Sequence, residues 1–310
     1  MTVLACSALV APLALYAAYG SGEEESPGPA REPTRQERSL LHRAEQILLR
    51  DCMRERGFTY RMVAEHPVKD AREFPYVIDD VAWAREHGHG TDIQRKQREL
   101  RRDNPNQRYF QSLSPERRAA ALEAANGARP DALTAKTPDG MRLTRSDEGC
   151  QAEAERRLYG DLAAWFQARS TLEVLPELTR QRVLEDSGFA TAVRPWARCM
   201  RAAGHSFDNP AEVRKKLAKQ PLPRNEEIRL AVAEAQCAHS SGLAKKVKAL
   251  QKRFDTEFRQ RFRSEVNTGQ RLQLAAIPRA RSIVEKSEQG TETGARDRPA
   301  SDNTSQREES

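Results

Sequence analysis

The chain has 310 residues, of which 38% are hydrophobic, 6% aromatic and 31% charged. That length is enough for a real core, and the modest apolar share favours helices with one buried stripe and polar, unfolded ends. The net charge of +7 is too small to identify a nucleic-acid binder and is compatible with anionic surfaces in general.

The first twenty residues indicate export. The apolar run VLACSALVAPLALYAAYG at 3–20 ends in small residues and precedes an acidic, Pro/Gly-rich segment. This pattern is typical of a secretory signal cleaved before Ser21, although no Lys or Arg precedes it. An uncleaved N-terminal anchor is the alternative, because the run reaches the roughly 17 residues needed to span a bilayer. We expect 1–20 to be a signal peptide or anchor and 21–34 a flexible linker.

Two similar segments, DCMRERGFTY at 51–60 and RCMRAAGHSF at 198–207, each contain Cys-Met-Arg, a glycine and an aromatic residue. Apolar residues at helical spacing precede or enter each segment: Leu41, Ala44, Leu48 and Cys52 in the first, Val193, Trp196 and Met200 in the second. Glycine just beyond a helix end permits a left-handed residue there. Each segment therefore predicts a helix that buries its cysteine, ends at Gly57 or Gly204, and turns back so that Tyr60 or Phe207 covers its last turn.

Four cysteines remain if Cys6 leaves with the signal: Cys52, Cys150, Cys199 and Cys237. An even number in an exported protein favours disulfides, and no two of the four are close enough in sequence for a typical zinc site. Sequence alone allows three pairings. Pairing Cys52 with Cys150 and Cys199 with Cys237 treats both halves alike, and we expect that connectivity.

Between these segments the sequence predicts further helices. SLSPERRAAALEAANG at 112–127 has Ser114 as cap and Gly127 as terminator, and Asn209 with Glu212 forms a capping-box pattern. Other helices are expected over part of 76–91 up to Gly88, from Ser146 through Trp165, and over 172–188 with Pro176 near the start. The segment 128–143 is expected to be a loop, since no strand or hairpin pattern is found in the chain.

The longest periodic segment begins near Asn225, and Pro278 is expected to end it. Its apolar stripe comprises Leu243, Val247, Leu250, Phe254, Phe258 and Phe262. The opposite surface is basic, and its candidate partner-binding residues are Lys245, Lys246, Lys248, Lys252, Arg253 and Arg259. This pattern fits a helix packed on the body with a basic solvated face, or a basic amphipathic helix that docks on an anionic surface.

The predicted fold class is all-α, with two Cys-Met-containing units stapled by disulfides and disordered termini. The helical domain is expected over 35–285, with units at about 35–170 and 171–285, and a disordered tail over 286–310.

Known catalytic and nucleotide-binding motifs are absent from the sequence. His87 and His89 flank Gly88, but no third ligand lies nearby in the sequence, so we predict no metal and no cofactor. Glu148, Glu153 and Glu155 lie among arginines, where solvated charge pairs are expected. No catalytic residue is assigned.

The stretches LLRDCMRERGFTY, VAWAREHGHGT, NQRYFQSLSPERRAAALEAANG, GCQAEAERRLYGDLAAWF and PWARCMRAAG resemble a group of uncharacterised secreted or lipid-anchored actinobacterial proteins. The resemblance covers about 40–205 and implies an exported, cell-envelope location. Cys6 does not occupy the lipobox position that such proteins often have at the cleavage site.

The leading functional hypothesis is a non-enzymatic exported protein, extracellular or anchored to the outer face of the cytoplasmic membrane. Its expected partner is an envelope protein, a membrane surface or an anionic cell-wall polymer, and no small-molecule substrate is identified. One alternative is a wall- or polymer-degrading hydrolase that uses a carboxylate pair in a cleft, one of them with a raised pKa. The other is a nucleic-acid binder acting through the basic helix at 243–263, which the predicted export disfavours.

Overall fold

A computed structural model describes residues 30–64 and 68–296 of the protein. The fold is all-α, as predicted, with one small hairpin. The helices are α1 (Arg35–Glu55), α2 (Val81–His87), α3 (Thr91–Arg102), α4 (Pro105–Ser112), α5 (Pro115–Asn126), α6 (Gly149–Tyr159), α7 (Leu162–Glu185), α8 (Ser187–Ala202), α9 (Pro210–Lys219), α10 (Arg224–Ser240), α11 (Leu243–Arg261) and α12 (Arg263–Arg296). The predicted signal or anchor, most of the predicted linker and the end of the predicted tail lie outside the described residues.

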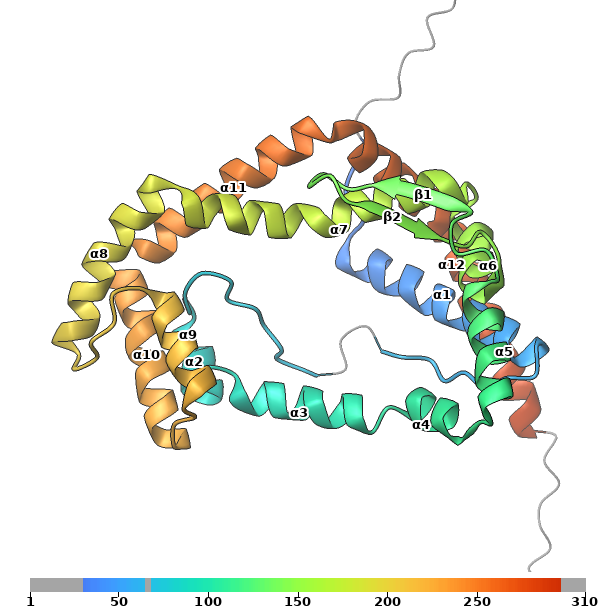
Figure 1. Ribbon diagram of the computed structural model, residues 1–310, viewed down its shortest axis with the longest axis horizontal. Coiled ribbons are helices and arrows are strands. Elements are labelled where there is room, and N and C mark those ends of the chain that lie inside the picture. Colours follow the sequence, from blue (N-terminus) through green and yellow to red (C-terminus); the bar gives the residue numbers. More distant parts are fainter. Residues whose placement is uncertain (1–29, 65–67, 297–310) are drawn as a thin grey trace, which may run out of the picture.

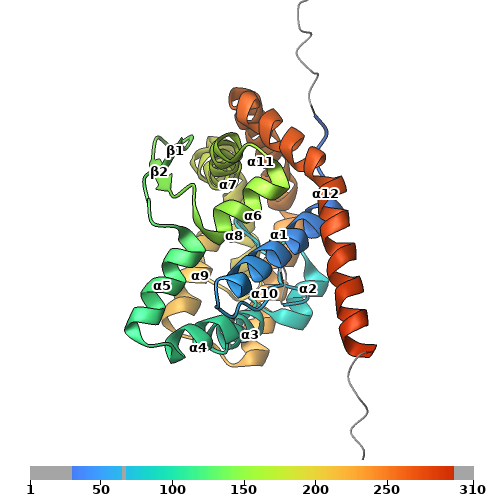
Figure 2. The ribbon, with the colours of Figure 1, turned by 90° about the vertical axis from the view of Figure 1, so that its right-hand side faces the viewer.

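Two long helices, α7 and α11, lie side by side and connect the two ends of the molecule (Figure 1). At one end α1, α6 and α12 pack together, with α5 and the hairpin nearby, and Figure 2 shows α12 meeting α1 at an angle. At the other end α8 and α10 pack on α11, and α2 packs on α10. Along the side opposite α7, helices α3 and α4 run between the two ends (Figure 1).

Separate hydrophobic cores form at the two ends. The larger lies among α7, α8, α10 and α11, where Trp196, Met200 and Leu243 are fully buried. A second lies among α1, α6, α7 and α12 and includes the fully buried Ala44 and Ala280, and two smaller clusters lie around the Cys52–Cys150 bond and between α2 and α10. Small residues at this second site allow helix backbones to approach closely, which explains how α12 can pack tightly against α1.

The two Cys-Met segments end their helices in the same way. Gly57 and Gly204 have positive φ angles of 78° and 85°. Two backbone hydrogen bonds of the Schellman type close each end: Phe58 N–H to Met53 C=O (2.9 Å) and Gly57 N–H to Arg54 C=O (2.9 Å) in α1, His205 N–H to Met200 C=O (2.8 Å) and Gly204 N–H to Arg201 C=O (3.0 Å) in α8. Phe207 then enters the larger core, whereas the Tyr60 hydroxyl donates to Gln46 on α1.

Both expected disulfides are present, but of the two cysteines predicted to be buried by their helices only Cys52 is, whereas Cys199 is half-buried. Cys52 and Cys150 join α1 to α6, and Cys199 and Cys237 join α8 to α10, with a Cα–Cα distance of 5.6 Å in each. Each bond therefore fixes two helices that border one of the cores. Among the described residues, no helix combines the length and apolarity that a bilayer crossing requires.

The expectation of a strandless loop over 128–143 is wrong. Strands β1 (Leu133–Lys136) and β2 (Arg142–Arg145) form an antiparallel hairpin whose turn contains Gly140, with a φ of 91°. The side-chain amide of Gln167 on α7 pairs with the backbone N–H and C=O of Lys136, at 2.9 Å each. The strands are short and mostly polar, so stability comes from this attachment to α7 rather than from a pattern visible in the hairpin itself.

Helix boundaries also differ from the expectations at prolines and glycines. The segment after Asn225 is three helices, because the chain breaks at Gly242 (φ 79°) and at Phe262. Pro278 lies inside α12, which continues past the predicted start of the tail to Arg296. Helix α7 begins at Leu162, after Gly160 ends α6, so Pro176 lies in its interior.

Candidate functional site

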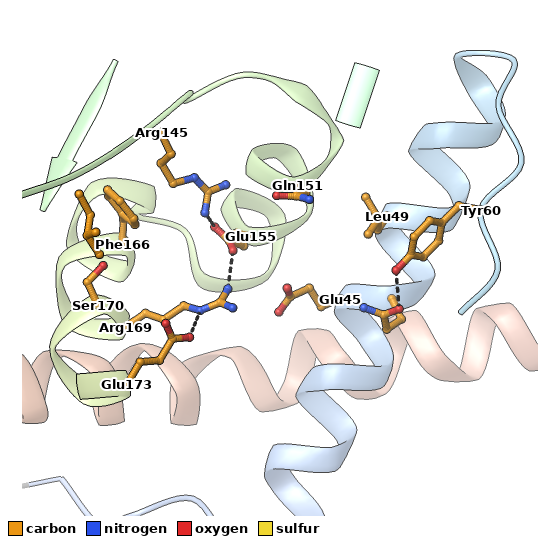
Figure 3. A pocket seen from close by; sticks show the side chains of 12 residues that line it. Glu45, Leu49, Tyr60, Arg145, Gln151, Glu155, Phe166, Arg169, Ser170 and Glu173 are labelled. Atoms are coloured by element: carbon orange, nitrogen blue, oxygen red, sulfur yellow. Dashed lines mark hydrogen bonds and ion pairs between the residues drawn. The ribbon is translucent and has the colours of Figure 1, made fainter. Parts of the chain in front are cut away.

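A pocket of about 390 Å³ lies between α1, α6, α7 and the β-hairpin (Figure 3). Its charged residues come from four elements: Glu45 from α1, Arg145 from β2, Glu155 from α6, and Arg169 with Glu173 from α7. The site is therefore assembled from segments that are far apart in the sequence.

Glu155 is the centre of the charges in this pocket. Its side chain is only 3% exposed, and each carboxylate oxygen is bound by a different arginine. Oε2 lies 2.6 Å from Nη1 of Arg145, and Oε1 lies 2.8 Å from Nη1 of Arg169. Arg169 also binds the exposed Glu173 through Nε at 2.7 Å. A buried carboxylate needs such partners, because an unpaired charge has a large desolvation cost.

Glu45 is the second carboxyl group, and Figure 3 shows it extending from α1 toward Arg169 and Glu155. Burial is the main reason that its pKa is raised, and the negative charge of Glu155 raises it further, while the field of Arg169 opposes the shift. Burial likewise raises the pKa of the Tyr159 phenol, and the negative charge of Glu45 raises it further. The pKa of Glu45 is thus raised by its place in the pocket.

The pocket supplies part of what a carboxylate-pair hydrolase needs. Glu45 has the raised pKa that a general acid requires. Glu155, however, has both oxygens held by guanidinium groups and almost no solvent contact, so it is not free to attack a substrate or to activate water. The arrangement is better explained as an ion-pair network that fixes α6, α7 and the hairpin to one another.

Glu155 also corrects an expectation. Glu148 and Glu153 are solvated charge pairs, bound to Arg129 (2.9 Å) and Arg56 (3.5 Å), but Glu155 is buried. A signal was present in the sequence, since Glu155 lies three residues from the buried Ala152 and Leu158 on the same helix face.

The predicted partner-binding residues lie on α11, whose apolar stripe up to Phe258 is buried against α7 and α8. Two of these residues are neutralised. Arg253 pairs with Asp186 at 2.5 Å, and Arg259 pairs with Asp255 at 2.9 Å and with Glu32 at 2.6 Å.

The four lysines of the set, Lys245, Lys246, Lys248 and Lys252, are exposed. Lys246 lies beside Gly188 and Asp186. Lys245, Lys248 and Lys252 recur at steps of three and four, so they share one face of α11, and their side chains make no ion pair within the described part of the chain. We call these three residues the lysine stripe.

The two histidines do not share a site. His87 Nδ1 lies 2.9 Å from Asp92 Oδ2, whereas His89 Nε2 lies 2.9 Å from Glu234 Oε2 on α10. Over residues 30–64 and 68–296, no group of three His, Cys, Asp or Glu side chains is placed to hold a metal ion.

Glu227 and Glu234 on α10 were not singled out from the sequence, and both are almost fully buried. Glu227 accepts the backbone N–H of His89 (2.8 Å) and the hydroxyl of Thr91 (2.6 Å), and Glu234 accepts the N–H of Ile78 (3.1 Å). The two carboxylates therefore hold the residues on both sides of α2 against α10 by hydrogen bonds.

Comparison with known proteins adds no relative from which a function is transferred. The chain matches no family model, no curated protein and no solved structure.

Proposed function

We propose that this is a non-enzymatic exported protein of the cell envelope that binds an anionic wall polymer through the lysine stripe of α11. The observation that supports this most directly is the stripe itself: three exposed lysines on one helix face, with no ion-pair partner in the described residues. Strongly hydrated ammonium groups on flexible stems suit the repeated point charges of a polyanion.

Export is supported by the sulfur chemistry. Two intramolecular disulfides fit an oxidising, extracellular environment, because reducing systems of the cytosol keep thiols reduced. The apolar run at 3–20 supplies the targeting segment in this proposal.

A polymer is a better partner than a membrane interior. An amphipathic helix that inserts at a membrane surface uses its apolar face, but residues such as Val247 and Phe254 of α11 are already buried in the core. Only charge attraction remains available to α11. A flexible chain with regularly spaced negative charges can follow the lysine stripe without inserting anything.

The proposal is tested with the full mature chain and immobilised poly(glycerol phosphate), with neutral dextran as the reference polymer. The triple variant K245Q/K248Q/K252Q is expected to bind at least about tenfold more weakly, since each lysine near an anionic surface contributes about 1 kcal/mol. The dependence of affinity on salt concentration should also become less steep, because fewer counterions are released.

A matched control keeps the change in net charge constant. Helix α9 also has three exposed lysines, and the variant K215Q/K216Q/K219Q removes the same charge elsewhere. It should retain nearly wild-type affinity. Equal losses in the two triple variants would mean that only net charge matters, and unchanged binding in the α11 variant would exclude the stripe as the binding surface.

A further inference from the structure

A second cavity, of about 630 Å³, lies at the other end of the molecule from the pocket of Figure 3. It is bordered by the segment before α2, the start of α3, and parts of α7, α9 and α10 (Figure 1). One side is apolar: the rings of Phe74 and Trp83 lie 4.8 Å apart, and Ile78, Ile93 and Leu217 adjoin them. The volume falls within the range of about 300–1,000 Å³ typical of small-molecule sites.

The charged residues around this cavity are mostly neutralised by protein partners. Arg180 is held by both oxygens of Glu177, at 2.5 and 2.7 Å, and Arg72 forms an ion pair with Asp80. The positive charges of these two arginines are therefore already neutralised by carboxylates of the protein.

Glu73, an exposed carboxylate of the same lining, forms no ion pair within the described residues, and neither does Arg214 on α9. Its guanidinium donates one hydrogen bond, from Nη2 to the carbonyl oxygen of Phe74 at 3.0 Å. No carboxylate of the described residues lies within ion-pair distance of it. The surrounding protein lowers the pKa of Arg214 by desolvation, and Arg180 lowers it further, while the field of Glu234 opposes the shift. Arg214 is an exposed residue, so its guanidinium is open to an anion from outside the chain.

A buried polar atom without a partner lies in the same lining. The side chain of His89 is 8% exposed, and its Nε2 is bound to Glu234, which is itself 1% exposed. The other ring nitrogen, Nδ1, is buried and has no hydrogen-bond partner in the described residues. Buried polar groups in native proteins are nearly always satisfied, so a partner from outside the chain, such as an ordered water or a ligand, is expected for this nitrogen.

We propose that this cavity binds a small aromatic carboxylate. The carboxylate pairs with the guanidinium of Arg214, whose planar donors suit a two-oxygen acceptor, and the ring packs on Phe74 and Trp83. Glu177 and Asp80, by holding Arg180 and Arg72, leave Arg214 as the cation that selects the negative charge. This site is separate from the lysine stripe and does not depend on polymer binding.

The test is titration of the purified mature protein with phenylacetate, followed by isothermal calorimetry and by the indole N–H resonance of Trp83. We expect saturable binding with a Kd of about 1 mM or tighter, given the small size of this probe. The uncharged phenylacetamide should bind at least about tenfold more weakly, because it lacks the charge that Arg214 recognises. Absence of saturable phenylacetate binding, or equal binding of the amide, would overturn the proposal.

Variants on α9 locate the site. R214Q should weaken phenylacetate binding at least about tenfold, and R214K, which keeps the charge but not the planar fork, should lie between R214Q and wild type. K215Q removes a neighbouring charge that does not border the cavity and should bind as wild type does. Circular dichroism melting should be unchanged in R214Q, since Arg214 makes a single protein hydrogen bond. Wild-type affinity in R214Q, or an equal loss in K215Q, would show that Arg214 is not the anchor.

Discussion

The backbone of Gly149 lies directly against that of Gly127, so neither residue has room for a side chain. A Cβ atom on Gly149 would lie 2.7 Å from the carbonyl carbon of Asn126, and one on Gly127 would lie 2.6 Å from the carbonyl oxygen of Glu148. Gly127 ends α5 and Gly149 begins α6, immediately before Cys150. This close contact therefore helps to place Cys150 opposite Cys52.

Alanine at Gly149 should be much more destabilising than alanine at Gly204. Both glycines have a φ of 85°, but nothing lies within 4 Å of a Cβ on Gly204. G204A should cost only the left-handed strain, about 1 kcal/mol, whereas G149A adds overlap with a backbone and should cost about 3 kcal/mol. Urea unfolding of both variants with disulfides intact measures the difference, and similar losses would contradict the importance of the contact.

Removing the charge of Glu155 should strongly destabilise the protein. E155Q leaves Arg145 and Arg169 without their shared buried carboxylate, and breaking such a pair costs about 3 kcal/mol or more. The matched control is E173Q, in the same network but 62% exposed, for which a loss below about 1 kcal/mol is expected. Chemical denaturation at neutral pH measures the free energy of unfolding of the two variants. Equal losses would show that the burial of Glu155 does not increase its contribution to stability.

The pKa of Glu45 predicts a pH dependence with a definite sign. A carboxyl group whose pKa is higher in the folded than in the unfolded state ionises first in the unfolded chain, so it reduces stability as the pH rises above its unfolded pKa of about 4.3. E45Q lacks this effect. The variant should therefore be more stable than wild type at pH 7, and its advantage should vanish near pH 3.

Thermal unfolding of wild type and E45Q across that pH range provides the measurement. Because all other groups are shared, their contributions cancel in the difference between the two proteins. A wild type that gains stability over E45Q between pH 4 and pH 7 would contradict a raised pKa at Glu45.

The two disulfides should differ in their contribution to stability. Their cysteines are 98 and 38 residues apart, for which loop-closure entropy gives upper figures of about 5 and about 4 kcal/mol. The double variant C52S/C150S should therefore unfold at a lower denaturant concentration than C199S/C237S, and both should unfold below wild type. The reverse order would mean that native-state packing at each bond outweighs the restriction of the unfolded chain.

Local signals in the sequence predicted several helices well. Ser114 accepts the N–H of Arg117 and Gly127 ends α5, as expected from the cap and the terminator. The Asn209 side chain accepts the backbone N–H of Glu212, as in a capping box. The Glu212 carboxylate, however, accepts the backbone N–H of Asp208. Capping is decided within three or four residues, so it can be recognised without knowledge of the rest of the fold.

Prolines were the main source of error in helix boundaries. Pro278 was expected to end a helix, yet it lies inside α12 between the buried Ile277 and Ala280. An interior proline costs about 3 kcal/mol, and packing of Ala276, Ala280 and Val284 beside α1 can offset that cost. The outcome depended on contacts with a segment more than two hundred positions earlier in the chain.

The candidate sites could be predicted only in part. The stripe of Lys245, Lys248 and Lys252 follows from helical spacing, because a basic face opposite an apolar stripe must face solvent. Neutralisation of Arg253 by Asp186 could not be predicted, since the partner lies between α7 and α8, far away in the sequence. The groups that surround Glu45, Glu155 and Arg214 could not be predicted either, because they also lie on distant segments of the chain.

The sequence by itself determined the helical class, the four cysteines that pair, the helix ends at Gly57 and Gly204, and the exposed lysines of α11. Each of these depends on spacing or on a conformation available within one turn of helix. The tertiary structure alone decided which charges are buried, which of them are paired, and which cavities they border. The free energy of a buried charge is set by groups brought to it from distant segments, and no pattern of neighbours in the sequence contains that information.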